Sequence, residues 1–469
     1  MVILHSICEL NLFLIKYCFF IFFGEVMPAQ SRQIHLGLFM HAAGHHSSGW
    51  RHPDAEFGSL NTQLIQRLAN QAEAACFDLV FFGDKLSTSA QDHPSIIVRY
   101  EPVALLGALS MTTQRIGLAA TASTTYSEPY QLARQFATLD HLSQGRIGWN
   151  VVTSAYDVAH NFTRPTHPVH AERYETAREF VTVVQGLWDS WEDGALIADR
   201  QLGQYMDGRK LHALNHSGKH YQIAGPLNIT RSVQGHPVLI QAGSSPAGIA
   251  LAAATAEVVF TAQQSLQGAQ TFYRDLKSQV VAQGRQPEHC LVMPGVMPLI
   301  ADTDEAAWQQ LADLQAFSNQ EESFRLLNDR LGHDVSGYPL DEPLPELPAT
   351  EGMMSRARLL LDLCHKEGRT LRDLLNLVSA ARGHWLLPGS AQTVADQLIS
   401  WFRNEAADGF NIMPAWFPDG LTRFVDEVLP LLRKEGLFRE EYQGNTLREH
   451  LGLPVPVNRY SQEAAHGTD

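Results

Sequence analysis

Several apolar runs in this chain end in polar or small residues at positions where a purely structural strand would stay apolar. This happens after FDLVFFG, after GLAA, within GRIGWNVVTSA and after VLIQA. Any one of these could be a strand that simply reaches the surface, but several at one edge of a sheet would form a hydrogen-bonding site for a ligand. The residues concerned include Asp84, Thr121, Thr124, Asn150, Ser244 and Ser245.

The stretch QAGSSPAGIALAAATA has the most specific physical meaning. It predicts a strand, a glycine-serine turn and a helix that begins near Pro246. The unpaired N–H groups and the positive dipole end of such a helix form a seat for an anion. Ser244 or Ser245 could instead serve only as the helix N-cap, and capping and phosphate binding can coexist.

His170 and Tyr174 are four residues apart in HAERYETAREF, so a helix places them on one face near its N-terminus. Two hydrogen-bonding side chains there could close over the phosphate or the ring of a ligand. The alternative is a solvated helix start with no ligand role.

Histidine, a common metal ligand, is abundant in this chain, with 21 residues. Three groups of histidines lie close together in the sequence: His41, His45 and His46; His160, His167 and His170; and His212, His216 and His220. None of these groups has the form HxH or HExxH, so they do not predict a catalytic metal. His41, at the end of the first apolar run, is a weaker candidate for a polar group near reacting atoms, with a loop histidine as the alternative. The sequence also lacks GxSxG, a Walker A motif and GxGxxG after a strand, which argues against a serine hydrolase, an NTPase and a Rossmann dehydrogenase.

The elements that must position these residues alternate between short apolar runs and amphipathic segments, the pattern of an α/β fold with a parallel sheet wrapped by helices. Eight strands are enough to close a (β/α)₈ barrel, in which loops after the strands assemble the active site on one face. The predicted strands are 34–40, 77–83, 115–121, 146–152, 237–242, 257–262, 290–297 and 409–413.

Helices are predicted at 61–76 and 421–436 from their apolar stripes. A third is predicted within YSEPYQLARQFATLDHLSQG, where Ser127 is the expected N-cap and Gly145 follows the end. Two intervals are too long for simple connections: 155–235 after the fourth strand and about 302–390 after the seventh. In a barrel such insertions lie over the active-site face, so we expect them to act as lids. Within the second, GYPLDEPLPELPATEG is expected to be an irregular loop.

Composition narrows the classes of partner. The chain has 469 residues, is 45% hydrophobic and carries 35 basic against 50 acidic side chains, a net charge of −15 with no Lys/Arg cluster. Nucleic acid is therefore not expected as a partner. The five cysteines are scattered and odd in number, which fits a reducing cytoplasm.

The first 26 residues differ in composition from the rest of the chain. An apolar stretch at 10–23 is too short to span a membrane and lacks the features of a signal peptide. We expect that translation starts at Met27 and that residues 1–26 are an extension, with a targeting role as the alternative. We further expect that 27–455 form one domain and that 456–469 are a flexible tail.

Assembled, these stretches resemble the nitrilotriacetate monooxygenase component A family, flavin-dependent two-component monooxygenases of the bacterial luciferase-like superfamily. The resemblance covers roughly residues 33–455. It is carried by FDLVFFGDKL, by the segment from EPVALLGALSMTT to GRIGWNVVTSA, by ERYETAREFVTVVQGLWDSWEDGAL, by GPLNITRSVQGHPVLIQAGSSPAG, by AEVVFTAQ and by the segment from DGFNIMPAWFPDG to LREHLGLP. The segment between Asp84 and Glu101 is short beside typical relatives.

The resemblance implies a cofactor, FMN in its reduced form FMNH₂, with O₂ as co-substrate. A separate NAD(P)H:flavin oxidoreductase would supply the reduced flavin, and a homo-oligomer, dimer or tetramer, is implied. It further implies flavin contacts at Asp84, Thr121, Asn150, His170, Tyr174, Ser244 and Ser245, with Thr124 as a weaker candidate.

The resemblance does not name the substrate, because family members oxidise aminopolycarboxylates, aromatic sulfones, alkanes and sulfur compounds. We expect a small organosulfur, amine or related compound. Trp50, Trp416 and Phe417 suggest an organic rather than highly charged molecule, with core packing as the alternative. Two other functions stay open: a flavin-binding protein without turnover, and a flavin-independent barrel hydrolase or aldolase.

Overall fold

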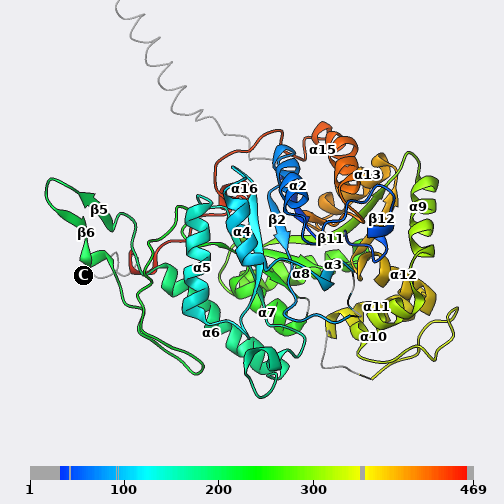
Figure 1. The fold of residues 1–469 in the computed structure, drawn as a ribbon, viewed down its shortest axis with the longest axis horizontal. Helices are drawn as coiled ribbons and strands as arrows, with labels where there is room; N and C mark the ends of the chain where they lie inside the picture. The colour runs from blue at the N-terminus through cyan, green and yellow to red at the C-terminus, as the bar shows by residue number, and fades with distance from the viewer. Residues whose placement is uncertain are drawn as a thin grey trace, which may run out of the picture. The chain divides into compact units, whose positions relative to one another are not determined.

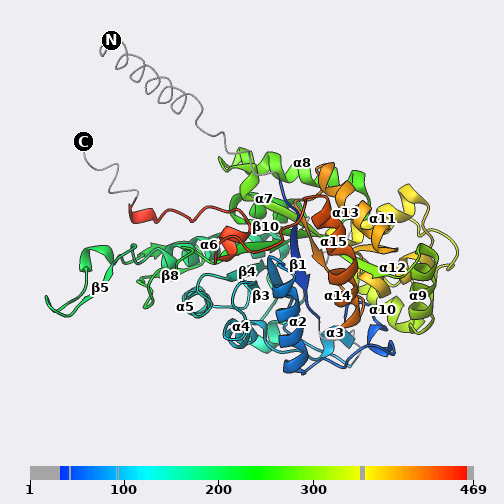
Figure 2. The ribbon, with the colours of Figure 1, turned by 90° about the horizontal axis from the view of Figure 1, so that it is seen from above.

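The computed structural model describes residues 32–461 apart from 42–43, 91, 93, 244 and 349–353. Parallel strands close into a barrel because β10 pairs with β11 and β13 pairs with β1 (Figures 1 and 2). The fold class predicted from the sequence is confirmed. Its eight strands in the described chain are β1 (His35–Phe39), β2 (Leu79–Phe82), β3 (Gly117–Ser123), β4 (Ile147–Val152), β9 (Val238–Ala242), β10 (Val258–Thr261), β11 (Leu291–Ile300) and β13 (Gly409–Ile412).

Alternate residues of each strand face the barrel interior or the surrounding helices, as a pleated strand requires. Phe39, Phe81 and Phe260 form an aromatic layer inside, with ring centroids 4.8 to 5.6 Å apart. On β4 the indole of Trp149 is fully buried against the helices, 5.8 Å from the ring of Phe136. Because Trp149 points outward, Asn150 points into the barrel.

Helices cover the outside of the barrel, as Figure 2 shows. Helix α5 begins at Pro129 with Glu128 as its N-cap residue, so the predicted Ser127 cap lies one residue too early. The helix predicted at 421–436 is interrupted by a π-helical turn at residues 424–428. The covering helices are α2 (Thr62–Ala74), α4 (Pro102–Ser110), α5 (Pro129–Leu142), α6 (His170–Trp188), α7 (Pro246–Thr255), α8 (Leu266–Ala282), α13 (Ala391–Arg403), α14 (Asp419–Arg423) and α15 (Leu429–Lys434).

Both predicted insertions are present. The first follows β4 and carries the β5–β6 hairpin (Leu196–Asp199, Gln204–Met206) and the short strands β7 (His216–Ser217) and β8 (Gln222–Ile223). The second follows β11, and its helices gather on the side of the barrel away from that hairpin (Figure 1). It contains α9 (Asp304–Ala316), α10 (Gln320–Leu331), α11 (Met354–Glu367), α12 (Leu371–Ala381) and the added strand β12 (Trp385–Gly389); short helices α3 (Pro94–Ile97) and α16 (Leu447–His450) lie elsewhere.

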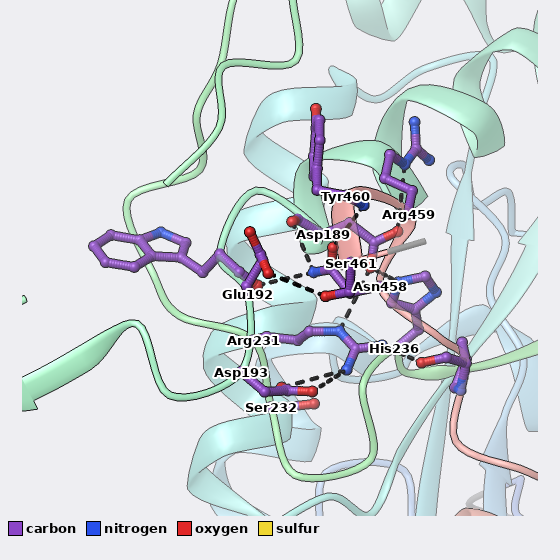
Figure 3. A network of polar contacts seen from close by, with 12 residues as sticks. Asp189, Glu192, Asp193, Arg231, Ser232, His236, Asn458, Arg459, Tyr460 and Ser461 are labelled. Carbon is purple, nitrogen blue, oxygen red and sulfur yellow. Dashed lines mark hydrogen bonds and ion pairs between the residues drawn. The ribbon is translucent and has the colours of Figure 1, made fainter. Parts of the chain in front are cut away.

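A polar network attaches the C-terminal segment to the first insertion (Figure 3). At its centre the buried Asp189 carboxylate lies 2.7 Å from His236 Nε2 and 3.3 Å from Arg459 Nε. Asn458 is also buried and donates to the backbone carbonyls of Asp189 and Trp191 at 3.0 Å. Residues 456–461 of the predicted tail are thus placed against the protein, and 462–469 lie outside the described residues.

His46, in the loop after β1, makes the stability of the fold depend on pH. The ring is buried, and burial lowers its pKa from 6.5 to about 4. Between these values the unfolded chain binds a proton that the folded chain does not, so the free energy of unfolding falls as pH falls through this window. The contribution is about 3 kcal/mol, from 1.36 kcal/mol per pKa unit.

We expect His46→Asn to reduce this pH dependence, because an asparagine oxygen can still accept the hydrogen bond that Ser48 N donates to His46 Nδ1. Urea unfolding at pH 8, 6.5, 5 and 4 measures the effect. The variant's loss of stability between pH 6.5 and 4 should be smaller than that of the parent protein by about 3 kcal/mol. Parallel pH profiles for the two proteins would contradict the assignment.

Candidate active site at the carboxyl ends of the strands

A cavity of about 330 Å³ opens at the carboxyl ends of the barrel strands, within the size range of small-molecule sites. It brings together Asp84, Thr121, His170, Tyr174 and Ser245, which lie far apart in the sequence. Its full lining is Asp84, Lys85, Leu86, Thr121, Ser123, Val152, Thr153, Ser154, Ala155, Tyr156, Val158, His170, Arg173, Tyr174, Ala242, Gly243, Ser245, Phe260, Thr261, Ala262 and His384.

The floor of the cavity is a short hydrogen-bonded chain. Thr121 Oγ1 donates to the carbonyl of Phe82 at 3.0 Å and accepts from Asn150 Nδ2 at 2.7 Å. Asn150 is buried behind Thr121 and is not itself among the lining residues. Its Oδ1 has no hydrogen-bond partner within the described chain. A buried acceptor left in this way suits an N–H donor of a ligand ring.

The wall formed by β9 and α7 has the predicted features of an anion seat. Helix α7 begins at Pro246, and Ser245 Oγ accepts from Gly248 N at 3.1 Å, so Ser245 does cap the helix. A Cβ atom built on Gly248 would lie 3.2 Å from the Tyr174 hydroxyl, which therefore sits directly over the first turn of α7. Ser244, the other predicted phosphate contact, lies outside the described residues.

Helix α6 contributes three lining residues at positions i, i+3 and i+4: His170, Arg173 and Tyr174. The hydroxyl of Tyr174 has no hydrogen-bond partner among the described residues, which leaves it available to a ligand. Arg173, which was not predicted, is buried and donates to the carbonyl of Pro168 at 3.1 Å. The helical spacing from His170 in HAERYE was the signal that could have found it.

Arg173 also organises the loop before α6. Its guanidinium contacts His167 Nε2, and His167 Nδ1 lies 2.7 Å from the Tyr126 hydroxyl. Burial lowers the pKa of His167, and the nearby Arg173 charge lowers it further. A neutral His167 can accept from Arg173 through one nitrogen and donate to Tyr126 through the other.

Residues from both insertions cover the cavity. Tyr156, from the first, donates its hydroxyl proton to Asp329 Oδ2 at 3.0 Å and accepts from Arg330 NH1 at 3.0 Å, both on α10. Burial raises the pKa of Tyr156. His384, from the second insertion, stacks on Phe260 with ring centroids 4.9 Å apart. Both insertions therefore supply covering residues, as expected of lids.

Asp84 lies where β2 ends and faces the cavity. Burial raises the pKa of its carboxyl group, and a hydrogen bond from the Lys85 backbone and the charge of Arg99 oppose that effect. A partly desolvated carboxylate accepts strong hydrogen bonds from N–H groups of a ligand.

Besides Asn150, two further predicted residues, Thr124 and His41, do not line this cavity. Thr124 is buried and donates to the carbonyl of Val152 at 3.2 Å. His41 is buried beside Phe39 and His45, with ring centroids 4.6 and 4.7 Å away, and it lines a separate cavity of about 40 Å³.

The predicted aromatic cluster is explained by packing. Trp416 and Phe417 are buried, and Trp416 stacks on His52 with ring centroids 3.9 Å apart. Trp50 is about half exposed, at 49%. None of these three described residues lines the cavity, so they say nothing about the substrate.

The part of the chain that the structure describes offers neither a metal site nor a membrane-spanning helix. No group of three or more histidine, cysteine, aspartate and glutamate side chains could hold a metal ion there. Instead, histidines of the first insertion pair with single carboxylates, as His212 does with Glu192 at 2.7 Å. No described helix is long and apolar enough to cross a membrane.

Comparisons with known proteins agree with this geometry. The chain is 48% identical to the N-acetyl-S-(2-succino)cysteine monooxygenase of Bacillus subtilis (strain 168) over 93% of this chain and 100% of that protein. It is 43% identical to nitrilotriacetate monooxygenase component A of Aminobacter aminovorans over 91% of this chain and 98% of that protein.

A crystal structure of riboflavin lyase with modified FMN and riboflavin has a TM-score of 0.83 and 31% identity, covering 92% of this chain and 99% of that one. The sequence profile of the luciferase-like monooxygenases matches residues 38–405. A match over this length, together with the closed barrel and its strand-end cavity, identifies the protein as a member of the luciferase-like monooxygenase family.

Proposed function

We propose that this protein is the oxygenating component of a two-component, FMNH₂-dependent monooxygenase. One atom of O₂ enters a small organic substrate and the other leaves as water, with FMNH₂ providing two electrons and two protons. A separate NAD(P)H:flavin oxidoreductase supplies FMNH₂. The observation that carries the proposal is the Tyr174 hydroxyl, which has no partner among the described residues and sits over the first turn of α7.

The donor set of the cavity fits FMN. Arg173, Tyr174, His170 and the backbone at the start of α7 would hold the phosphate, because a dianion is best matched by a guanidinium, a hydroxyl and helix N-terminal N–H groups. Ser244 and Ser245 belong to the same segment.

The remaining polar groups suit the flavin ring. Asp84 and the Asn150–Thr121 pair would meet its N–H and carbonyl groups, and Thr124 would support β3 from behind the cavity. When bound, reduced FMN supplies the ability to activate O₂. The chain's own residues orient it and exclude water under Tyr156 and Leu86.

The named relatives support the reaction class. They include monooxygenases of an S-succinylated cysteine derivative, of nitrilotriacetate and of dibenzothiophene sulfone. We accordingly propose an organosulfur, amine or related substrate. His41 is a weaker candidate for a polar group near the reacting atoms, because it lines a separate cavity. Its ring contacts Phe39, which in turn contacts the cavity residue Phe260.

We also propose one domain from 27 to 455, a homo-oligomer and a cytoplasmic location. The buried free thiols of Cys76, Cys290 and Cys364 support a reducing compartment.

The reaction is tested by stopped-flow mixing of the protein and photoreduced FMN with oxygenated buffer. We expect the rate at which the bound flavin reoxidises to differ by about tenfold or more from the rate for free FMNH₂, because the cavity controls the access of water and O₂. Bovine serum albumin at the same concentration is the control. Reoxidation identical to that of free flavin at saturating protein would refute the proposed function.

A further inference from the structure

We propose that His384 is a catalytic residue: its imidazole N–H donates a hydrogen bond to the oxygen that becomes negatively charged as O₂ is reduced. The inference rests on the proposed function, because it requires FMNH₂ in the strand-end cavity. It gives a role to a lining residue that none of the flavin contacts explains.

His384 closes the cavity on the side of β10. Its ring stacks on Phe260, with ring centroids 4.9 Å apart and the ring planes inclined by 17°. Phe260 in turn contacts Phe39 and Phe81 of the aromatic layer inside the barrel, at 5.4 and 5.6 Å between centroids. The imidazole therefore lies between this layer and the space in which the flavin and O₂ would meet.

Three backbone hydrogen bonds hold His384 in place. Its N–H donates to the carbonyl of Ala381 at 2.9 Å, and Gln264 Nε2 donates to the carbonyls of Gly383 and His384, both at 2.8 Å. Only 3% of the residue is exposed. A donor that is fixed before the reaction needs no reorganisation when charge develops in front of it.

The packing of the ring decides which nitrogen can act. A Cβ atom built on Gly295 would lie 2.5 Å from His384 Nδ1, so this nitrogen lies against the backbone of β11. The missing side chain at Gly295 makes room for the imidazole. Nε2 is therefore the nitrogen that can meet an oxygen atom in the cavity, and it donates both as the neutral Nε2–H tautomer and as imidazolium.

Other strong donors of the cavity wall already have a partner or a role. Arg173, Tyr174 and His170 are assigned to the phosphate of FMN. Lys85 forms an ion pair with a nearby carboxylate at 2.6 Å. His384 is thus the lining imidazole that the proposed flavin contacts do not use.

The donor has a defined task in the reaction with O₂. Two electrons pass from FMNH₂ to O₂, and the oxygen gains negative charge before it gains protons. In a cavity closed to water, a fixed N–H that points at this charge lowers the barrier, as the donors of an oxyanion hole do. One oxygen atom then enters the substrate, and the other leaves as water with both protons of FMNH₂, so His384 ends the reaction unchanged.

The test combines stopped-flow reoxidation of the protein–FMNH₂ complex by O₂ with anaerobic titration of FMNH₂. We expect His384→Phe to lower the second-order rate constant for O₂ by at least about tenfold, because the variant keeps a ring on Phe260 but loses the N–H donor. Its affinity for FMNH₂ should stay within about threefold. His384→Gln restores an N–H donor and should react at least about threefold faster than His384→Phe.

His160→Phe is the matched control, because His160 is exposed and does not line the cavity. An unchanged rate constant in His384→Phe would overturn the role, and two equally slow His384 variants would assign the loss to packing instead. A normal rate at saturation with a tenfold weaker affinity would make His384 a flavin contact. A parent protein that does not bind FMNH₂ would refute the proposed function and this inference with it.

Discussion

Replacing Arg173 with methionine should weaken the binding of FMNH₂ by about 100-fold while changing the binding of reduced riboflavin by no more than about threefold. Riboflavin lacks the phosphate, so the comparison isolates that end of the cofactor. Arg173 is buried on the cavity wall one helical turn from His170 and adjacent to Tyr174. A charge-assisted hydrogen bond to a dianion is among the strongest contacts that a side chain makes.

Anaerobic fluorescence titration with the two reduced flavins measures the effect. Arg178→Met is the matched control, because Arg178 lies on the same helix and is exposed. Tyr174→Phe removes only a neutral hydroxyl and should weaken FMNH₂ binding by about tenfold, again with little effect on riboflavin. If Arg173→Met weakened both flavins equally, Arg173 would act by holding His167 and the loop before α6, not by binding phosphate.

The second large effect concerns stability. Replacing Arg146 with methionine should lower the free energy of unfolding by about 4 kcal/mol, because it leaves several buried acceptors without a donor. Arg146 is buried at the start of β4, and its guanidinium donates to the carbonyls of Ser143 at 2.7 Å, Ile116 at 2.7 Å, Ser110 at 3.1 Å and Thr113 at 3.0 Å. It thereby joins α4, β3 and β4.

Urea unfolding followed by circular dichroism measures this loss, with Arg134→Met as the control. Arg134 is exposed on α5, so its replacement should change the free energy of unfolding by less than about 0.5 kcal/mol. Similar midpoints for the two variants would mean that the surroundings of Arg146 relax to satisfy its acceptors in another way.

The barrel strands were predictable because each is a short apolar run flanked by turn residues, and burial on both faces makes such runs continuous. The residues at which the strands end were harder to predict. β3 continues to Ser123 although Thr121 and Ser123 are polar, because Ala122 and Ser123 still pair with β4. The sequence alone suggested that the strand stopped at Thr121, since it does not show which polar residues are held inside a barrel.

The site was predictable where a strand end or a helix start carried the signal, as at Asp84, Thr121, His170, Tyr174 and Ser245. It was not predictable where the cavity is completed by chain from a distant insertion. His384 lies 300 residues after Asp84 in the sequence, yet both line the cavity. Tyr156 faces the cavity because α10 holds its hydroxyl group. Such contacts depend on how the insertions fold back over the barrel, which local periodicity does not encode.

We propose that the strand-end cavity holds reduced FMN with its phosphate at the first turn of α7. A crystal structure of the full-length protein soaked anaerobically with FMNH₂ tests it most directly. We expect density for the flavin ring between Asp84 and Thr121, with the phosphate within hydrogen-bond distance of Tyr174 and Arg173. Flavin bound anywhere else on the protein, or a cavity without flavin at saturating concentration, would contradict it.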